Sequence, residues 1–319
     1  MCFLPPPPLL LLLLLTPLRS QAGHEGAGGD ITTLDWNCHG TRLATGSYDG
    51  LGRIWDVNGQ LLQTLKSHRG PIFSLKWNRR GDLLLSGSVD ASAIIWDAAS
   101  GQKRQQFQFH SLPALDVDWK DDTTFASCST DKSIYVCRLD EDKPVRHFTG
   151  HRDEVNAVKW DPSSTLLASC SDDYTAKVWS MDSNSPKLDL LGHKKEIYTI
   201  NWSPSGPGSK NPGLPLLLAS ASFDTTVKLW DVATGACKHT LAKHTAPIYS
   251  IAFSPDGKYL VSGSIDRSLL VWNVKDGALI RRYRGEGEVF EVSWDSTGRR
   301  VAACFSNSKL AVLDFDMRK

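Results

Sequence analysis

Three short stretches decide the fold of this chain: Ile72-Phe-Ser-Leu-Lys-Trp77, Leu85-Ser-Gly-Ser88 and Ser92-Ala-Ile-Ile-Trp96. The first and third are rich in β-branched and aromatic residues and the second in small residues, which is typical of β-strands. The 3.6-residue pattern of an amphipathic helix does not appear. We therefore expect an all-β protein.

The same strand pattern repeats along the chain. An aromatic residue closes one strand of each repeat, at steps of 41 or 42 residues with one step of 51: Trp36, Trp77, Trp119, Trp160, Trp202, Phe253 and Trp294. A second marker, a dipeptide that is Trp-Asp in its fullest form, shares this period: Trp55-Asp56, Trp96-Asp97, Cys137-Arg138, Trp179-Ser180, Trp230-Asp231, Trp272-Asn273 and Leu313-Asp314. A period of about 40 to 45 residues is that of four-stranded propeller blades. The sequence predicts a β-propeller of seven repeats over residues 30–319.

The single long step has a visible cause. The turn that reads Asp161-Pro-Ser-Ser-Thr165 in the fourth repeat is replaced in the fifth by Ser203-Pro-Ser-Gly-Pro-Gly-Ser-Lys-Asn-Pro-Gly213. A Pro/Gly-rich insertion of this kind is expected in a surface turn, where extra length has a small entropic cost.

The composition is that of a globular chain whose charges cancel. Of 319 residues, 41% are hydrophobic and 22% are charged, and 36 Lys and Arg stand against 35 Asp and Glu. Attachment to DNA or to a membrane surface by bulk electrostatics is therefore not expected. The partners that we expect are proteins, each recognised by a local patch.

The first 29 residues form an atypical segment that we expect to be unstructured. Four prolines precede a run of seven leucines, Leu9 to Leu15, and a Gly-rich stretch follows. The leucines resemble the apolar part of a signal peptide, but no Lys or Arg precedes them, and the run is shorter than a membrane span. Secretion is the alternative to an intracellular chain.

The seven cysteines are odd in number and widely spread, without the paired spacing of a zinc or redox motif. Three of them belong to a column of small residues that lies three positions before each turn Asp: Gly46, Gly87, Cys128, Cys170, Ala221, Gly263 and Cys304. A tight slot between neighbouring blades explains such a column. We expect neither a metal nor a cofactor.

His, Ser, Asp and Trp recur together, which invites a serine-hydrolase interpretation. The four sets are His68, Ser88, Asp90 and Trp96; His151, Ser171, Asp173 and Trp179; His193, Ser222, Asp224 and Trp230; and His244, Ser264, Asp266 and Trp272. Four copies cannot all be active sites, and no Gly-x-Ser-x-Gly context surrounds these serines. We expect a structural relay instead, in which indole donates to Ser, Ser to imidazole, and imidazole to Asp. No catalytic residue is predicted.

Ligands of propellers bind where loops and strand starts of several blades converge, at the mouth of the channel. Six residues before each strand-closing aromatic residue lie Asp30, Pro71, Pro113, Glu154, Glu196, Pro247 and Glu288. Four residues before it lie Thr32, Phe73, Leu115, Asn156, Tyr198, Tyr249 and Phe290, and the residue before each turn Asp or Asn is Tyr48, Val89, Thr130, Asp172, Phe223, Ile265 or Ser306. Acids and aromatic rings suit a basic peptide. The predicted site is Asp30, Tyr48, Phe73, Glu154, Glu196, Tyr198, Phe223, Tyr249, Glu288 and Phe290; packing of the aromatic rings between blades is the alternative.

Several longer segments resemble the transducin β-like 1 family, and the last of them resembles its plant-type members that act in histone deacetylation: Asp30–Trp36, Leu43–Gly50, Phe109–Trp119, Phe125–Asp131, Lys195–Gly208 and Val301–Ser306. The resemblance runs from about Asp30 to Met317. It implies an eight-bladed WD-repeat propeller, of which this chain lacks one blade, and N-terminal dimerisation and F-box-like modules, which it also lacks.

What the resemblance implies about function is a nuclear corepressor subunit, an adaptor and not an enzyme. Such a subunit links histone deacetylase complexes to histone tails and to the ubiquitin machinery. Two alternatives stay open: a substrate-recognition adaptor of a ubiquitin ligase, and a generic WD-repeat signalling scaffold in the cytoplasm. Fold alone does not choose among them.

Overall fold

The computed structural model describes residues 30–307 and 309–315, and all regular structure within these ranges is β-strand, so the predicted all-β class is confirmed. The segment 1–29, including the leucine run, lies outside the described residues. The chain divides into two compact units between Thr149 and Gly150. Each unit is described by itself.

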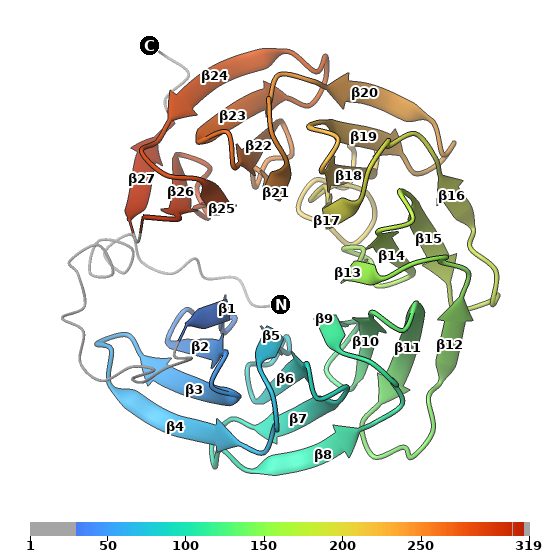
Figure 1. Cartoon of the computed structure of the whole chain (residues 1–319), viewed down its shortest axis with the longest axis vertical. Helices are drawn as coiled ribbons and strands as arrows, with labels where there is room; N and C mark the ends of the chain where they lie inside the picture. The colour runs from blue at the N-terminus through green and yellow to red at the C-terminus, as the bar shows by residue number, and fades with distance from the viewer. Residues whose placement is uncertain (1–29, 308, 316–319) are drawn as a thin grey trace. The chain divides into compact units, whose positions relative to one another are not determined.

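The first unit holds three antiparallel four-stranded sheets, here called blades 1 to 3 in chain order (Figure 1). Blade 1 consists of β1 (Ile31–Trp36), β2 (Arg42–Ser47), β3 (Leu51–Asp56) and β4 (Leu61–Lys66). Blade 2 consists of β5 (Ile72–Trp77), β6 (Leu83–Ser88), β7 (Ala93–Asp97) and β8 (Lys103–Phe107). Blade 3 consists of β9 (Ala114–Trp119), β10 (Thr124–Ser129), β11 (Ser133–Arg138) and β12 (Arg146–Thr149).

The second unit holds blades 4 to 7. Blade 4 consists of β13 (Val155–Trp160), β14 (Leu166–Ser171), β15 (Ala176–Ser180) and β16 (Leu188–Leu190). Blade 5 consists of β17 (Ile197–Trp202), β18 (Leu217–Ser222), β19 (Val227–Asp231) and β20 (Cys237–Leu241). Blade 6 consists of β21 (Ile248–Phe253), β22 (Tyr259–Ser264), β23 (Ser268–Asn273) and β24 (Leu279–Arg284). Blade 7 has three strands within the described ranges: β25 (Val289–Trp294), β26 (Arg300–Phe305) and β27 (Leu310–Asp314).

The strand-closing tryptophans join neighbouring blades within each unit. In the first unit, Trp77 Nε1 donates to the carbonyl oxygen of Asp35 (3.0 Å), and Trp119 Nε1 donates to that of Lys76 (3.0 Å). In the second unit, Trp202 Nε1 donates in the same way to the carbonyl oxygen of Lys159 (2.8 Å). An indole N–H is only a donor, so each ring fills its hydrogen-bonding capacity on the preceding blade. This accounts for the tryptophan at these positions of the first periodic marker.

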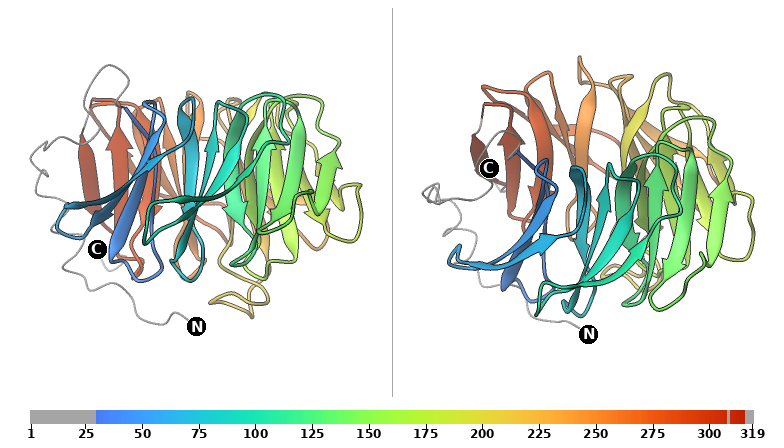
Figure 2. Two further views of the ribbon diagram at one scale, coloured as in Figure 1. Left: turned by 90° about the horizontal axis from the view of Figure 1, so that it is seen from below. Right: turned by 60° about the horizontal axis from the view of Figure 1, so that its bottom comes forward.

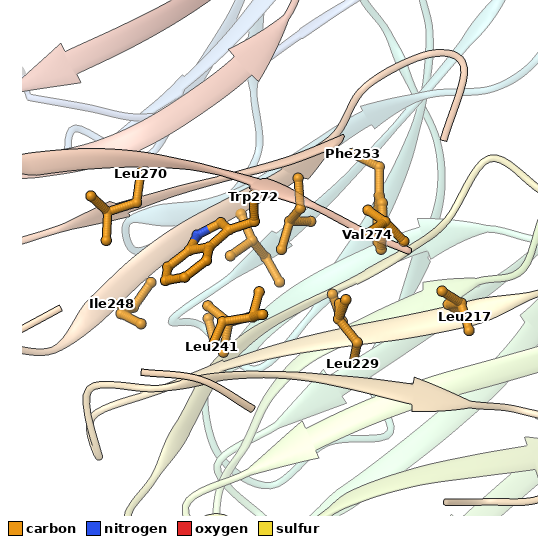
Figure 3. Packing of buried hydrophobic residues seen from close by; sticks show 13 residues of the cluster. Leu217, Leu229, Leu241, Ile248, Phe253, Leu270, Trp272 and Val274 are labelled. Atoms are coloured by element: carbon orange, nitrogen blue, oxygen red, sulfur yellow. The ribbon is translucent and has the colours of Figure 1, made fainter. Parts of the chain in front are cut away.

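Apolar side chains between blades form the core. Leu229 and Leu241 of blade 5 lie in one buried cluster with Ile248, Leu270 and Trp272 of blade 6 (Figure 3). All five are 2% exposed or less. Burial of a side chain of this size stabilises a fold by about 1.5–3 kcal/mol. A blade is thus held mainly by the neighbour that covers its face.

The column of small residues lies where blades approach most closely. A Cβ atom added to Gly46 would lie 2.8 Å from Ile72 Cγ2, and one added to Gly263 would lie 2.5 Å from Val289 Cγ1. In both cases the glycine and its neighbour belong to successive blades of one unit. Real Cβ atoms do not come so close to a carbon atom, because packed interiors have no room for overlap. The predicted inter-blade slot is confirmed at these positions.

The insertion of blade 5 forms the loop between β17 and β18, drawn in gold, which projects beyond the neighbouring strand ends (Figure 2). Ser205 and Asn211 form an isolated bridge within it. The Asn211 side-chain amide donates to the carbonyl oxygens of Pro204 (2.7 Å) and Pro255 (3.0 Å). The loop is therefore anchored to blade 6 by hydrogen bonds, as expected for a surface turn that satisfies its own polar groups.

Candidate functional site

Blade 4 shows the hydrogen-bond relay in its full form. Trp179 Nε1 donates to Ser169 Oγ (2.8 Å), Ser169 Oγ lies 2.7 Å from His151 Nε2, and His151 Nδ1 lies 2.9 Å from Asp173 Oδ2. An indole can only donate, so Ser169 accepts from Trp179 and its own proton is free for Nε2. The arrangement suits a neutral histidine that accepts at Nε2 and donates its Nδ1 proton to the Asp173 carboxylate.

Three further blades repeat this geometry. The chains of contacts are Trp96, Ser86, His68 and Asp90 in blade 2; Trp230, Ser220, His193 and Asp224 in blade 5; and Trp272, Ser262, His244 and Asp266 in blade 6. The relay serines are fully buried. Their hydroxyl protons are already engaged, so the arrangement locks strands and offers no nucleophile to a substrate.

The serine predicted for each relay was wrong by two positions. Ser88, Ser171, Ser222 and Ser264 do not contact the indole or the imidazole. In blade 4, Ser171 Oγ instead donates to the carbonyl oxygen of Asp153 (3.1 Å) and accepts the N–H of Asp173 (3.0 Å). The physical reason is the register: Ser171 lies at the end of β14 against the turn, whereas the indole of Trp179 reaches the middle of that strand.

Blade 3 keeps the relay without its tryptophan, and sequence reasoning missed its histidine. His110 Nε2 lies 2.9 Å from Ser127 Oγ, and His110 Nδ1 lies 3.0 Å from Asp131 Oδ2. Burial raises the pKa of Asp131, but hydrogen bonds from His110 and Ser111 outweigh it and hold that pKa at about 2. The signal was present, because His110 precedes Asp131 at nearly the same spacing as in the relays of blades 2, 4 and 6. Burial also raises the pKa of Cys137, which takes the tryptophan's place, to about 12.

The relay of blade 4 should make stability depend on pH. Burial lowers the pKa of His151 below its ordinary 6.5, although the Asp173 carboxylate acts in the opposite sense. The unfolded chain then binds more protons than the folded chain once the pH falls below about 6.5, so the free energy of unfolding should fall there. Urea unfolding at pH 7.5 and 5.5 should show a larger acid loss for the native chain than for His151→Gln. Equal losses would contradict this assignment.

One edge of the blades carries the three columns of positions from which the ligand site was predicted. The first column lies six residues before each strand-closing aromatic residue, the second lies four residues before it, and the third lies directly before each turn Asp or Asn. In every blade the residue before the turn Asp or Asn donates its backbone N–H to the carbonyl oxygen of the first-column residue, as Phe223 does to Glu196 (3.0 Å) and Tyr48 does to Asp30 (3.0 Å). The remaining pairs are Val89 with Pro71, Thr130 with Pro113, Asp172 with Glu154, Ile265 with Pro247, and Ser306 with Glu288. The first and third columns therefore lie side by side in each blade.

The second column coincides with a β-bulge in all seven blades. The register between the first two strands shifts at one residue each time, and that residue is Thr32, Phe73, Leu115, Asn156, Tyr198, Tyr249 or Phe290. A bulge leaves one residue unpaired and re-aims its side chain. Residue spacing alone did not predict these β-bulges.

Blades 4 and 5 bring acidic residues together. Burial and the nearby charges of Glu196, Asp153 and Asp173 raise the pKa of Asp172, against a lowering hydrogen bond from Asn156. Asn156 Nδ2 donates to Asp172 Oδ1 (2.6 Å) and to the carbonyl oxygen of Ile197 (3.0 Å), which joins the two blades. With the predicted Glu154, whose carbonyl oxygen accepts the N–H of Asp172, these residues form what we call the acidic cluster: Asp153, Glu154, Asp172 and Glu196. Sequence reasoning left Asp153 and Asp172 out of the site.

An aromatic cluster adjoins it across blades 5, 6 and 7. Ring centroids lie 5.9 Å apart for Tyr198 and Phe223, 4.7 Å for Tyr198 and Tyr249, and 5.9 Å for Tyr249 and Phe290. Tyr198 is 43% exposed and Phe290 46% exposed. We name Tyr198, Phe223, Tyr249 and Phe290 the aromatic cluster. Its rings pack against one another, as the alternative interpretation expects, and they also present apolar surface to solvent; peptide binding by these rings stays a prediction.

The remaining predicted site residues lie elsewhere. In the first unit, Tyr48 of blade 1 contacts Phe73 of blade 2 edge to face, with centroids 5.8 Å apart, and Asp30 lies beside Tyr48. Glu288 belongs to blade 7, where its N–H is bonded to Ser306 Oγ (3.0 Å). Across the described part of the chain, no group of three or more His, Cys, Asp or Glu residues is arranged to hold a metal ion, and no helix is long and apolar enough to cross a membrane.

The sequence matches a known family over most of its length. The family described as WD domain, G-beta repeat matches residues 15–56, 59–97, 142–180, 184–231 and 235–273. The chain belongs to the WD-repeat family. Families of WD-repeat propellers are generally non-catalytic scaffolds for protein interactions.

Two curated relatives of this WD-repeat chain carry informative names. It is 57% identical over 285 residues to the F-box-like/WD repeat-containing protein TBL1X of Mus musculus, an alignment that covers 89% of this chain and 54% of the relative. It is 55% identical over 288 residues to the WD40 repeat-containing protein HOS15 of Arabidopsis thaliana, covering 90% of this chain and 47% of the relative. The chain thus spans about half the length of these relatives. The predicted resemblance to the transducin β-like 1 family is confirmed.

A solved structure supports the fold of the WD-repeat chain. The C-terminal WD40 domain of Sif2 matches with a TM-score of 0.80 and 26% sequence identity, over 90% of this chain and 81% of that one. The predicted WD-repeat β-propeller is confirmed, with seven blades among the described residues.

Proposed function

We propose that the chain is a non-catalytic scaffold of a transcriptional corepressor, which binds basic histone tails and links them to a histone deacetylase complex in the nucleus. The observation that carries the proposal is the acidic cluster lying next to the aromatic cluster on one edge of blades 4 to 7. Carboxylates pair with Lys and Arg side chains, and exposed aromatic faces attract the same cations and pack against their aliphatic stems.

The two clusters suggest an order of contacts along the bound peptide. Glu196 directly precedes β17, and Tyr198 is the second residue of that strand. The acidic cluster and the aromatic cluster are therefore adjacent in blade 5. A segment with a cation followed by an apolar or further cationic residue would contact both. Aromatic residues at the centre and charges at the rim are the usual composition of binding hot spots.

The corepressor role rests on similarity as well. The relatives named TBL1X and HOS15 are the ones whose sequence this chain follows over about nine-tenths of its length. The name of TBL1X also contains the term F-box-like, which favours a second candidate function: substrate recognition for a ubiquitin ligase.

Affinity purification separates these functions. The full chain, tagged at its C-terminus and expressed in cells, should recover histone deacetylase subunits and core histones. Recovery of ubiquitin-ligase components without a deacetylase would favour the second function. Recovery of proteins of the secretory pathway alone would contradict both. A chain with Glu154→Lys and Glu196→Lys, which should lose the histones, serves as the matched control.

A further inference from the structure

Blade 6 carries a cationic pocket that includes the relay residue Asp266 and lies outside the acidic and aromatic clusters. It has a volume of about 250 Å³ and is lined by Thr245, Asp266, Ser268, Arg282 and Arg284. Both arginines lie on β24, the edge strand of the sheet, and both are exposed. Nothing in the proposed histone-binding function uses this pocket.

The register of blade 6 places the two arginines together. Ser268 pairs with Arg284 and Leu270 with Arg282, so the arginines are two residues apart on one strand and face the same side of the sheet. Arg282 Nη2 donates to the carbonyl oxygen of Lys243 (3.0 Å), which fixes its guanidinium while leaving further N–H groups available. Within the described ranges, neither arginine forms an ion pair with a carboxylate.

The carboxylate in the pocket is already engaged. Asp266 accepts hydrogen bonds from His244 (2.9 Å) and from the N–H groups of Thr245 (3.0 Å) and Ser268 (2.8 Å). Two guanidinium groups against one relay carboxylate leave the pocket net positive. A near-neutral chain therefore has a local excess of positive charge here.

The hydroxyl of Ser268 also differs from its equivalents. In blades 2, 4 and 5 the corresponding hydroxyls of Ser92, Thr175 and Thr226 donate to the relay Asp at 2.6–2.7 Å. Asp266 accepts the backbone N–H of Ser268, and within the described residues the Ser268 hydroxyl makes no hydrogen bond, so this hydroxyl, which lines the pocket, can donate to a ligand there. The arginines are likewise particular to blade 6, because blade 5 has Thr240 where blade 6 has Arg282, and Ala242 two residues later.

We propose that this pocket binds a phosphorylated serine or threonine side chain of a partner protein. A phosphate monoester carries close to two negative charges and three acceptor oxygens, and it matches paired guanidinium forks and hydroxyl donors. A nucleic acid fits less well, because its charge is spread along a backbone and needs a continuous run of cations. The compact pair of arginines on an otherwise near-neutral chain favours a single, doubly charged group.

A phosphopeptide library tests the proposal. The probe is a mixture of peptides with a fixed central phosphoserine and degenerate flanks, applied to the immobilised full chain, with the same library lacking phosphate as reference. Phosphorylated peptides should be retained preferentially. Arg282→Thr with Arg284→Ala, which copies the residues of blade 5, should reduce the affinity of a selected peptide at least tenfold while leaving the unfolding midpoint within a few degrees.

A charge-matched variant decides whether the site is specific. Lys238→Ala with Lys275→Ala removes two exposed cations of the same unit outside the pocket, and it should leave the affinity within twofold. Equal losses in both variants would show general electrostatic attraction and overturn the proposal. Equal retention of the two libraries, or stronger retention of a single-stranded oligonucleotide than of any phosphopeptide, would overturn it as well.

Discussion

Gly263→Val should destabilise the second unit by about 3 kcal/mol or more, since overpacking of a filled core typically costs 1–3 kcal/mol and sometimes more. The first added carbon alone would lie 2.5 Å from Val289 Cγ1 and 2.9 Å from Val292 Cγ1. Both neighbours are buried and belong to β25 of the next blade, so neither can move without separating blades 6 and 7. Urea unfolding of the full chain measures the loss.

A second glycine supplies the control for this experiment. A Cβ added to Gly213, in the inserted loop, would meet no atom within 4 Å. Gly213→Ala should therefore change the free energy of unfolding by no more than about 0.5 kcal/mol. An unchanged unfolding midpoint for Gly263→Val would show that the slot between the blades is not tight.

Reversal of two charges should have the largest effect on binding. Glu154→Lys together with Glu196→Lys replaces attraction by repulsion in the acidic cluster, and we expect the affinity for a lysine-rich peptide to fall about 100-fold at low salt. The difference should shrink as salt is added, because exposed charges are screened. Fluorescence anisotropy of a labelled peptide measures both effects.

The control for the charge reversal alters the same number of charges elsewhere. Asp142 and Asp276 are exposed residues outside the acidic cluster. Asp142→Lys with Asp276→Lys should change the affinity less than threefold. If the two double variants bind equally, net charge and not the cluster determines binding.

The fold could be predicted from the sequence because the same strand pattern, with the same marker positions, recurs in seven repeats. In the periodic series from Trp36 to Trp294 one contact recurs, the indole bond to the preceding blade, at Trp77, Trp119, Trp202 and Trp294. The small-residue column has one cause as well, shown at Gly46 and Gly263. Patterns that follow a common contact are visible without coordinates.

Features that depend on register were harder to predict. Ser169 and Ser171 are both buried serines on β14, and only the strand pairing shows that the indole of Trp179 reaches the first of them. The seven bulges could not be predicted either, because a bulge is an extra residue in one strand relative to its partner and not a residue type. Tyr198 and Tyr249, whose rings contact each other, both lie at such bulges.

The acidic cluster was predicted only in part. Glu154 and Glu196 came from one column of the repeat, but Asp172 belongs to another column and Asp153 to none. Their common position arises because Asn156 joins blade 4 to the start of β17. A contact made by one pair of blades alone, unlike one that recurs in every repeat, leaves no periodic signal in the sequence.

Hydrogen exchange with and without a lysine-rich peptide tests the binding face most directly. Peptide fragments that contain Glu154, Asp172, Glu196, Tyr198 and Tyr249 should exchange more slowly in the complex, while the outer strands β16, β20 and β24 should not change. Protection confined to those outer strands, or equal exchange everywhere at saturating peptide, would contradict the assignment of the acidic and aromatic clusters as the site where this scaffold binds its partner.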